Sequence, residues 1–169
     1  MNLDKLYRLQ EELDKHIWER HRTLEKMDKE ELLDSTILAL LVEVGELANT
    51  TRCFKHWSTK GMMEKEIVLD ELADVLHFYL STGNQMGYKM NTKKYEISTI
   101  RGFSIVDVFI DIYIDIDYLW IREYREVNYS VLGMRILTLA DLLGFTEEEV
   151  EQAYMKKHKE NYRRQEEGY

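Results

Sequence analysis

The spacing of apolar residues along the chain predicts helices. Near the start, Leu3, Leu6, Leu13 and Ile17 are three, seven and four positions apart, which places them on one helical face. Similar apolar segments follow, separated by short polar or glycine-containing stretches. A turn is expected at 58–62 and a loop at 88–102. We predict six helices, at residues 3–21, 29–57, 63–85, 105–120, 129–143 and 147–165.

The segment 105–120 carries two conflicting signals. Apolar and acidic residues partly alternate in it and β-branched residues are frequent, which favours a strand. However, Asp107, Asp111 and Asp115 are four apart and would form one acidic stripe on a helix. A strand over the whole segment would also greatly exceed the usual length of roughly five to six residues. We therefore favour a helix.

The boundary between the last two helices is well marked. Gly144 stands where a helix-terminating C′ residue belongs, and Thr146 with Glu149 forms a capping-box pattern. No repeat, low-complexity tract or linker-like stretch divides the chain. We expect a single domain over residues 1–169, folded as an all-α bundle of about six helices.

Composition supports this architecture and excludes several classes of protein. The 169 residues contain no proline and only eight glycines, which suits long helices. A single cysteine, Cys53, forms no intramolecular disulfide, so we expect a reducing, cytoplasmic environment. The charged start predicts no signal peptide, and no apolar run approaches the ~18–20 residues of a membrane span. A net charge of -9 argues against a nucleic-acid polymer as partner.

Two of the predicted helices each carry a pair of carboxylates. Glu43 and Glu46 are three residues apart in one helix, and Glu71 and Asp74 in the next, so each pair shares a face. Their neighbours are almost all apolar or small, which indicates burial. Four desolvated acids repel one another unless a cation lies among them. Mg²⁺, or Mn²⁺, is the expected ligand. A buried polar network and a solvated acidic face remain alternatives.

A di-iron site is a second metal hypothesis. His77 follows Asp74 by three residues, which resembles half of the Glu-x-x-His pattern of such sites. The first acidic pair is followed by Asn49 rather than a histidine, so the symmetrical motif is absent. Ligation by oxygen alone favours Mg²⁺ or Mn²⁺ over iron. His77 is equally compatible with a core histidine that has a hydrogen-bond partner.

The acidic pairs and their surroundings resemble a known family. The pattern Glu43-x-x-Glu46, 24 residues, Glu71-x-x-Asp74 is similar to the signature of the all-α nucleoside triphosphate pyrophosphatases, the MazG-like superfamily. The segments 46–49, 51–57 and 74–78, the ending Asn-x-x-Arg-Gln-x-x-Gly-Tyr at 161–169, and residues 9–14 resemble the dimeric dUTPases. Relatives often have asparagine in place of Asp14. Residues 88–135 match no motif of the family.

The resemblance implies an activity and a set of roles. Dimeric dUTPases are homodimers that hydrolyse dUTP, and also dUDP, to dUMP with Mg²⁺. A water molecule attacks the phosphorus next to the α–β bridge. We expect Glu46 to orient and deprotonate this water, and Glu43, Glu46, Glu71 and Asp74 to hold the metal. Cys53 needs no catalytic role and is interpreted as a small buried residue.

The phosphates of such a substrate need positive partners in an acidic chain. Lys157, Asn161 and Arg164 are four and three residues apart in the last helix and so lie on one face, where they can contact phosphate oxygens. The alternative is a solvated basic helix end that complements the helix dipole. Lys55 is a weaker second candidate.

The base requires a polar partner and an apolar wall. Gln10 falls within the apolar stripe of the first helix, and its amide can match the N3–H donor and O4 acceptor of uracil. Trp57, expected at the end of the second helix, is a candidate wall, with core packing as the alternative. Phe78 is a candidate contact to the deoxyribose.

Two other functions remain open. The first is a dCTP-directed or broader nucleoside triphosphate pyrophosphatase, which keeps the fold and changes the base. Gln10 and the terminal motif favour dUTP, because broader relatives generally lack both. The second is a non-enzymatic helical dimer that binds a protein partner and uses its acids only structurally.

Overall fold

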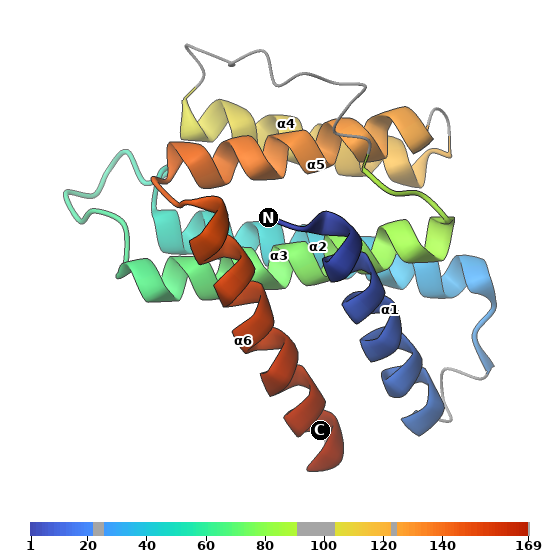
Figure 1. The fold of residues 1–169 in the computed structure, drawn as a ribbon. Coiled ribbons are helices and arrows are strands. Elements are labelled where there is room, and N and C mark those ends of the chain that lie inside the picture. The colour runs from blue at the N-terminus through green and yellow to red at the C-terminus, as the bar shows by residue number, and fades with distance from the viewer. Residues whose placement is uncertain (22–25, 91–103, 123–124, 169) are drawn as a thin grey trace.

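The computed structural model describes residues 1–21, 26–90, 104–122 and 125–168. Within these ranges the chain forms six helices and no strand, which confirms the predicted all-α bundle (Figure 1). Most of the loop expected at 88–102 lies outside the described residues. The helices are α1 (Leu3–Arg20), α2 (Lys29–Thr51), α3 (Lys65–Met86), α4 (Ile105–Trp120), α5 (Arg125–Leu142) and α6 (Glu147–Glu166).

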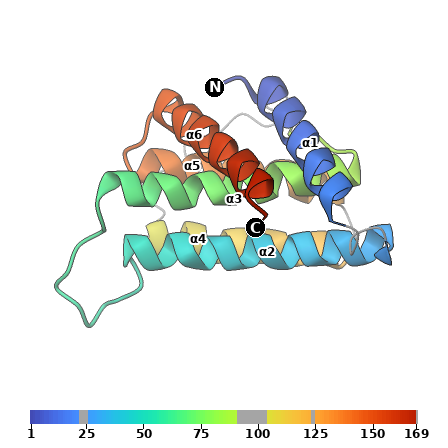
Figure 2. The same cartoon turned by 90° about the horizontal axis from the view of Figure 1, so that it is seen from below.

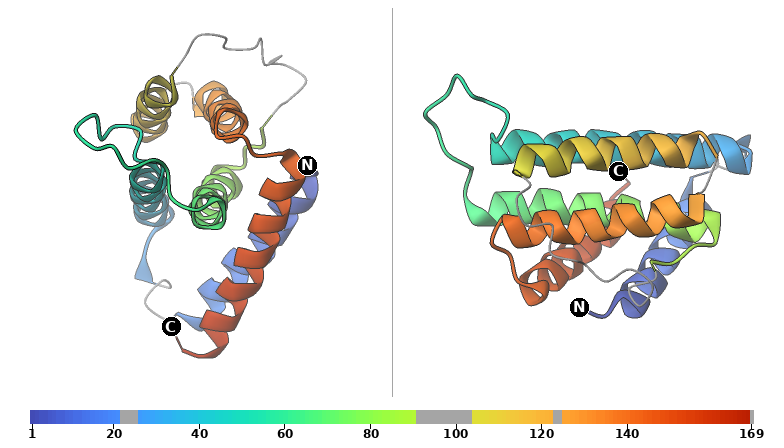
Figure 3. Two further views of the ribbon diagram at one scale, coloured as in Figure 1. Left: turned by 90° about the vertical axis from the view of Figure 1, so that its left-hand side faces the viewer. Right: turned by 90° about the horizontal axis from the view of Figure 1, so that it is seen from above.

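Four of the helices form a bundle and the other two cover one side of it. Seen end-on, α2, α3, α4 and α5 lie at the corners of a rectangle, with α4 beside α2 and α5 beside α4 (Figure 3). α2 and α3 run antiparallel, as their colours show in Figure 2. α1 and α6 pack against each other and cross α3 obliquely (Figures 1 and 2). α3 therefore has neighbours on several sides, and it contributes much of the buried core.

Capping side chains fix where three helices begin. Asp28, Ser104 and Thr146 each accept a hydrogen bond from the backbone of the third residue of the helix that follows, and that residue returns a bond to the cap. Such boxes satisfy backbone N–H groups that have no partner inside the helix. The box predicted at Thr146 is confirmed, and Gly144 has the positive φ of 81° expected of a C′ glycine.

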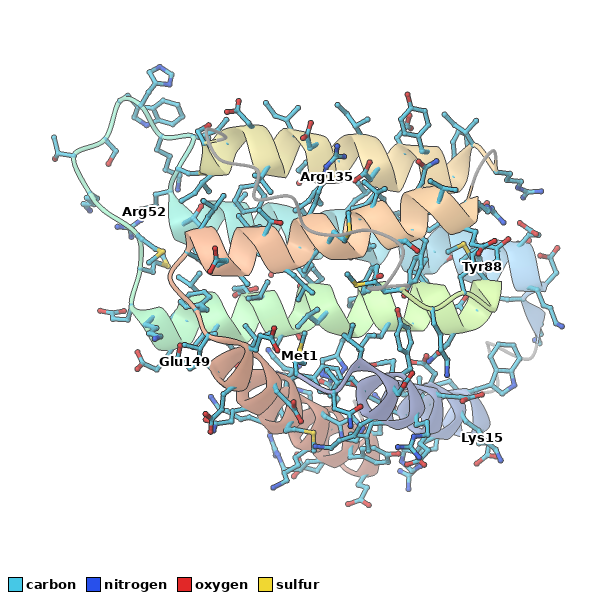
Figure 4. All side chains as sticks on the ribbon, turned by 45° about the horizontal axis from the view of Figure 1, so that its top comes forward. Met1, Lys15, Arg52, Tyr88, Arg135 and Glu149 are labelled. Atoms are coloured by element: carbon cyan, nitrogen blue, oxygen red, sulfur yellow. The ribbon has the colours of Figure 1, made fainter. Side chains whose placement is uncertain are left out.

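The end of α2 was predicted wrongly. Apolar and aromatic residues up to Trp57 suggested that the helix continues, but α2 ends at Thr51. Thr50 and Thr51 donate their hydroxyls to the carbonyls of Leu47 and Ala48, a bonding pattern that weakens the helix at its end. Arg52 then adopts a left-handed conformation with φ of 56°. Figure 4 shows Arg52 where the ribbon of α2 passes into the loop.

The ambiguous segment 105–120 is a helix, and two of the three acids of its stripe pair with the neighbouring helix, while Asp107 is exposed at the helix start. Asp107 caps the helix through Ser104. Asp115 is buried and lies 2.6 Å from Arg135 of α5, while Asp111 lies 3.5 Å from the same guanidinium. Figure 4 shows Arg135 between the ribbons of α4 and α5. The spacing of four therefore serves an ion-pair contact between two helices.

The outer side of α2 and α4 exposes a stripe of apolar residues. The stripe consists of apolar side chains spaced four apart on α2 and of others with the same spacing on α4. The two helices pack against each other. The most exposed members are Leu38 (61%), Val42 (50%), Ile110 (54%), Ile114 (46%) and Tyr118 (47%). We call this surface the α2–α4 face. Contiguous apolar surface of this kind on a folded domain marks a contact site.

A search of the described ranges for membrane-spanning helices finds no single helix that is long and apolar enough. Taken together, α5 and α6 have the length and apolar composition of a membrane span, but the two helices are bent by 109° relative to each other.

Candidate active site

Three carboxylates converge where α2 and α3 pass each other. Glu43, Glu46 and Glu71 each place one carboxylate oxygen within 4.8 Å of the others. The helical period explains this arrangement, because Val44, Leu47 and other apolar neighbours turn into the core while the acids stay at the seam. Glu46 is the exposed member of the group, and Glu43 and Glu71 are half-buried.

The fourth predicted ligand, Asp74, takes a different partner. Its carboxylate lies 2.6 Å from the ammonium nitrogen of Lys157, which comes from α6. The same nitrogen lies 2.6 Å from Asp70, one turn earlier on α3. The structure therefore adds Asp70 to the site, a residue that was not among the predicted ligands. The signal was available, because Asp70 and Asp74 are spaced four apart on one helix.

The acids of the site are electrostatically strained. Burial raises the pKa of Glu43 to about 7, with further contributions from Asp74 and Glu46. Burial also raises the pKa of Glu71, again helped by Asp74 and Glu46. The pKa of Asp74 is raised by burial even though Lys157 opposes the shift. A solvated acidic face would not show this pattern, because water would stabilise the charges.

These donors fit a hard divalent cation. Every convergent group is a carboxylate, and carboxylate oxygens are the ligands that Mg²⁺ and Mn²⁺ prefer. A bound cation would relieve both the repulsion and the desolvation of the acids. His77, the residue on which the di-iron hypothesis depended, lies in the core 2.6 Å from Gln10. Burial lowers its pKa to about 3, and the neighbouring His158 adds to this.

The predicted phosphate-binding residues of α6 lie beside the acids. Lys157 contacts Asp74, and Arg164 is close enough to lower the pKa of the same carboxylate. Arg164 also pairs with Glu160 at 3.1 Å. Asn161 lies between them on the helix and is half-buried. A groove of about 1160 Å³ runs along α6, and Asn161 does not line it. Its charged lining residues are six cations, Lys5, Lys156, Lys157, Lys159, Arg163 and Arg164, and five acids, Asp70, Glu147, Glu148, Glu151 and Glu160.

Gln10 is buried and its amide is held in one orientation. The side-chain oxygen lies 2.6 Å from His77 Nδ1 and accepts a hydrogen bond from the Tyr154 hydroxyl at 3.0 Å. Its nitrogen donates to Asp14 at 2.7 Å. The carbonyl is thus occupied within the protein, and only the NH₂ group has a hydrogen left to offer. The expected match of both amide atoms to uracil is not available in this arrangement.

A cavity one turn further along α1 is lined by Asp14, the residue that accepts the Gln10 amide N–H, and Gln10 itself is not among its lining residues. The cavity has a volume of about 410 Å³ and lies between α1, α2 and α3, with Asp14, Trp18, Phe78 and Ser81 among its lining residues. The second carboxylate oxygen of Asp14, Oδ2, is buried and has no hydrogen bond of ordinary geometry, although the Ser81 hydroxyl lies close enough to act on the carboxyl. Burial raises the pKa of Asp14 to about 6, and Gln10 and Ser81 oppose the shift. In the sequence, Asp14 stands out only as a departure from the family pattern.

Trp57 and Lys55 lie in the loop after α2. Trp57 is 70% exposed and makes edge contacts with Phe54 and His56. Lys55 donates to Asn49 at 2.6 Å. The loop projects from the end of α2 and α3, away from α1 (Figure 1), and Trp57 is not among the residues that line the cavity beside Asp14. Within one chain, Trp18 and Phe78 rather than Trp57 are the aromatic residues at that cavity.

Comparison with known proteins identifies the family of this chain. The family model described as dUTPase matches residues 2–169, which is nearly the whole chain. The chain belongs to the dUTPase family. No curated protein matches it. Membership supports a hydrolase of the dUTP diphosphatase type with a nucleotide substrate, built on an all-α fold. The convergent acids and the adjacent cavity are the features on which such an activity would depend.

Proposed function

We propose that this protein hydrolyses dUTP, and also dUDP, to dUMP with the help of Mg²⁺ or Mn²⁺. The observation that supports this most strongly is the convergence of Glu43, Glu46 and Glu71 within 4.8 Å in a chain that matches the dUTPase family over residues 2–169. A divalent cation, when bound, would draw charge from the phosphate oxygens and lower the pKa of water. Glu43, Glu46, Glu71 and Asp74 would hold it.

Glu46 is the proposed general base. It is the most exposed of the convergent acids, so a water molecule can reach its carboxylate from the solvent side. The water oxygen attacks the phosphorus next to the α–β bridge while its proton passes to Glu46. The bond from this phosphorus to the bridging oxygen breaks. dUTP then yields dUMP and pyrophosphate, and dUDP yields dUMP and phosphate.

The cavity beside Asp14 is the proposed site for the base. Asp74, Phe78 and Ser81 are spaced four and three along α3, so they share a face, and the cavity begins about one turn from the acids. The N3–H of uracil would donate to the Asp14 carboxylate, and Gln10, which does not line the cavity, would hold that carboxylate in place through its own N–H. Cytosine has an unprotonated N3, which would face the Asp14 carboxylate without a proton between them.

Residues of α6 are the proposed contacts to the phosphates. Arg164 and Asn161 lie on the same side of the helix as Lys157, and Lys157 and Arg164 line the groove along α6, which is lined by cations and acids alike. Guanidinium and amide groups are good donors to phosphate oxygens. The roles of Trp57 and Lys55 in substrate binding stay predictions, because neither lines the cavity beside Asp14.

We further propose that the protein is a homodimer that uses the α2–α4 face. Its exposed members follow the i, i+4 spacing on two helices that touch each other, with Leu38 and Val42 on α2 and Ile110 and Ile114 on α4. A second copy can present the same stripe around a two-fold axis, as symmetric dimers do. Glu46 continues the spacing of four that Leu38 and Val42 begin on α2, so a second copy on this face would lie beside the carboxylate site.

The proposed reaction is tested by following the water oxygen. Hydrolysis of dUTP in water labelled with ¹⁸O should place the label in dUMP, since attack is proposed at the phosphorus next to the α–β bridge. Label in the released pyrophosphate would mean attack at the other phosphorus and would overturn the step. A chain that releases no dUMP from dUTP with Mg²⁺ present would overturn the function.

A further inference from the structure

The ammonium group of Lys157 occupies one side of the carboxylate site. Its nitrogen lies 2.6 Å from an oxygen of Asp70 and 2.6 Å from an oxygen of Asp74. The two aspartates are one turn apart on α3, so a single ammonium reaches both. Lys157 is only 7% exposed, and solvent and salt therefore screen these contacts weakly.

Lys157 is held as a charged group. Burial by itself would lower its pKa, but the hydrogen bonds to Asp70 and Asp74 outweigh burial and the pKa is raised. A buried charge that loses its partner costs several kcal/mol. With two aspartates in contact, the ammonium keeps one partner even when the other is taken away.

Asp74 is the point where two cations would compete. Its carboxylate raises the pKa of both Glu43 and Glu71, so it belongs electrostatically to the convergent acids. The same carboxylate forms an ion pair with the ammonium group of Lys157. One carboxylate oxygen does not serve an ammonium at 2.6 Å and a divalent cation equally well, because each repels the other.

We propose that Lys157 is the internal counter-ion of the carboxylate site, which neutralises Asp74 before a divalent cation binds and stays on Asp70 when the cation takes Asp74. Asp70 is then a positioning residue that receives the displaced ammonium. The inference rests on the proposed use of a divalent cation. The competing interpretation is a structural ion pair that only fastens α6 to α3.

Cation affinity separates these interpretations without any measurement of turnover. Mn²⁺ is titrated into the full chain without nucleotide and followed by calorimetry. Lys157→Met keeps the aliphatic stem and removes the competing charge, so it should bind Mn²⁺ about fivefold or more tightly than the unchanged chain. Unchanged or weaker Mn²⁺ binding by Lys157→Met would overturn the inference.

Lys156 provides a matched control. Its side chain is 76% exposed and its nitrogen lies 3.8 Å from Asp70, so Lys156→Met removes the same charge from the same helix without touching Asp74. This variant should change Mn²⁺ affinity less than about twofold, because exposed charges are well screened. An equal gain in both variants would show a general effect of net charge and would contradict a specific role of Lys157.

Asp70 offers a second route that does not depend on the folding of Lys157→Met. Asp70→Asn should weaken Mn²⁺ binding, because Lys157 is then left with Asp74 alone. Glu66→Gln removes one negative charge from the exposed start of the same helix and should weaken it clearly less. Equal losses in the two variants would overturn the proposed role of Asp70. If the unchanged chain binds no Mn²⁺ at all, the proposed metal dependence itself fails, and this outcome is distinct from the others.

Discussion

The side-chain oxygen of Gln10 lies 2.6 Å from Nδ1 of His77, and this contact fixes which end of the amide faces Asp14. The oxygen also receives the Tyr154 hydroxyl, and the Tyr154 and His77 rings are stacked with centroids 4.2 Å apart. The NH₂ end is thereby directed at Asp14. The proposed recognition of the base through Asp14 thus rests on a core network that joins α1, α3 and α6.

Gln10→Leu tests this network. The substitution leaves the His77 N–H buried without an acceptor and the Tyr154 hydroxyl with only the long contact to the Leu6 carbonyl at 3.4 Å, which should lower the free energy of unfolding by about 1–3 kcal/mol. It should also raise the KM for dUTP, because Asp14 loses the donor that orients it. Urea unfolding and steady-state kinetics measure the two effects. Unchanged stability would show that the network is not formed in solution.

Asp14 makes substrate affinity depend on pH. Its pKa is raised to about 6 by burial, so the carboxylate is largely ionised at neutral pH and becomes protonated as the pH falls through about 6. A protonated oxygen accepts poorly from the uracil N3–H. The KM for dUTP should therefore rise as the pH falls below about 6. Glu11 and Lys15 of α1 are the other charged groups near this carboxyl.

Asp14→Asn supplies the control for the pH effect. An amide does not titrate in this range, and it offers an oxygen to the same N–H, so the variant should bind dUTP with a KM that changes little between pH 5 and about pH 7. A KM that still rises in Asp14→Asn as it does in the unchanged chain would assign the effect to another group. Profiles of KM and kcat against pH for both proteins decide the point.

Glu46→Gln tests the proposed base. The residue is exposed, so the fold should be retained, while kcat should fall by a factor of roughly 10² to 10⁴ because no carboxylate takes the proton of the water. Glu66→Gln changes an exposed acid at the start of α3 and should leave kcat unchanged. Undiminished kcat in Glu46→Gln would remove the residue from this role.

Ile114→Glu tests the proposed dimer. Ile114 is 46% exposed in the α2–α4 face, and a charge at the centre of an apolar contact between two copies should prevent their association. Light scattering should then report a monomer, while helical content stays the same. Leu142→Glu changes a similarly exposed residue of α5 (39%) outside this face and should remain dimeric. A monomeric unchanged chain would contradict the proposal.

The helices were largely predictable because their signals are local. The spacing of apolar residues, the Thr146 capping box and Gly144 are each signals that span only a few residues. Each of them indicated a helix or a helix boundary that the structure contains. The end of α2 was missed because the hydroxyls of Thr50 and Thr51 and the left-handed Arg52 stop the helix, whereas the apolar pattern continues. The acids were found from their spacing, which the helix geometry converts directly into a common face.

Contacts between distant segments were not predictable in the same way. The sequence placed Lys157 among phosphate ligands, but its partners Asp70 and Asp74 lie on α3 and only the packing of α6 across α3 brings them together. The orientation of the Gln10 amide is set by His77 and Tyr154 from two other helices. Asp14 gained its significance from a cavity that only the assembled bundle creates.

The most direct test of the account is the rate at which the protein cleaves a panel of nucleotides, with Mg²⁺ and with a chelator. We expect dUTP to yield dUMP and pyrophosphate only when Mg²⁺ is present, with kcat/KM for dUTP exceeding that for dCTP by roughly 100-fold or more. A protein that leaves dUTP intact, works equally well with the chelator, or cleaves all nucleoside triphosphates at one rate would contradict the account.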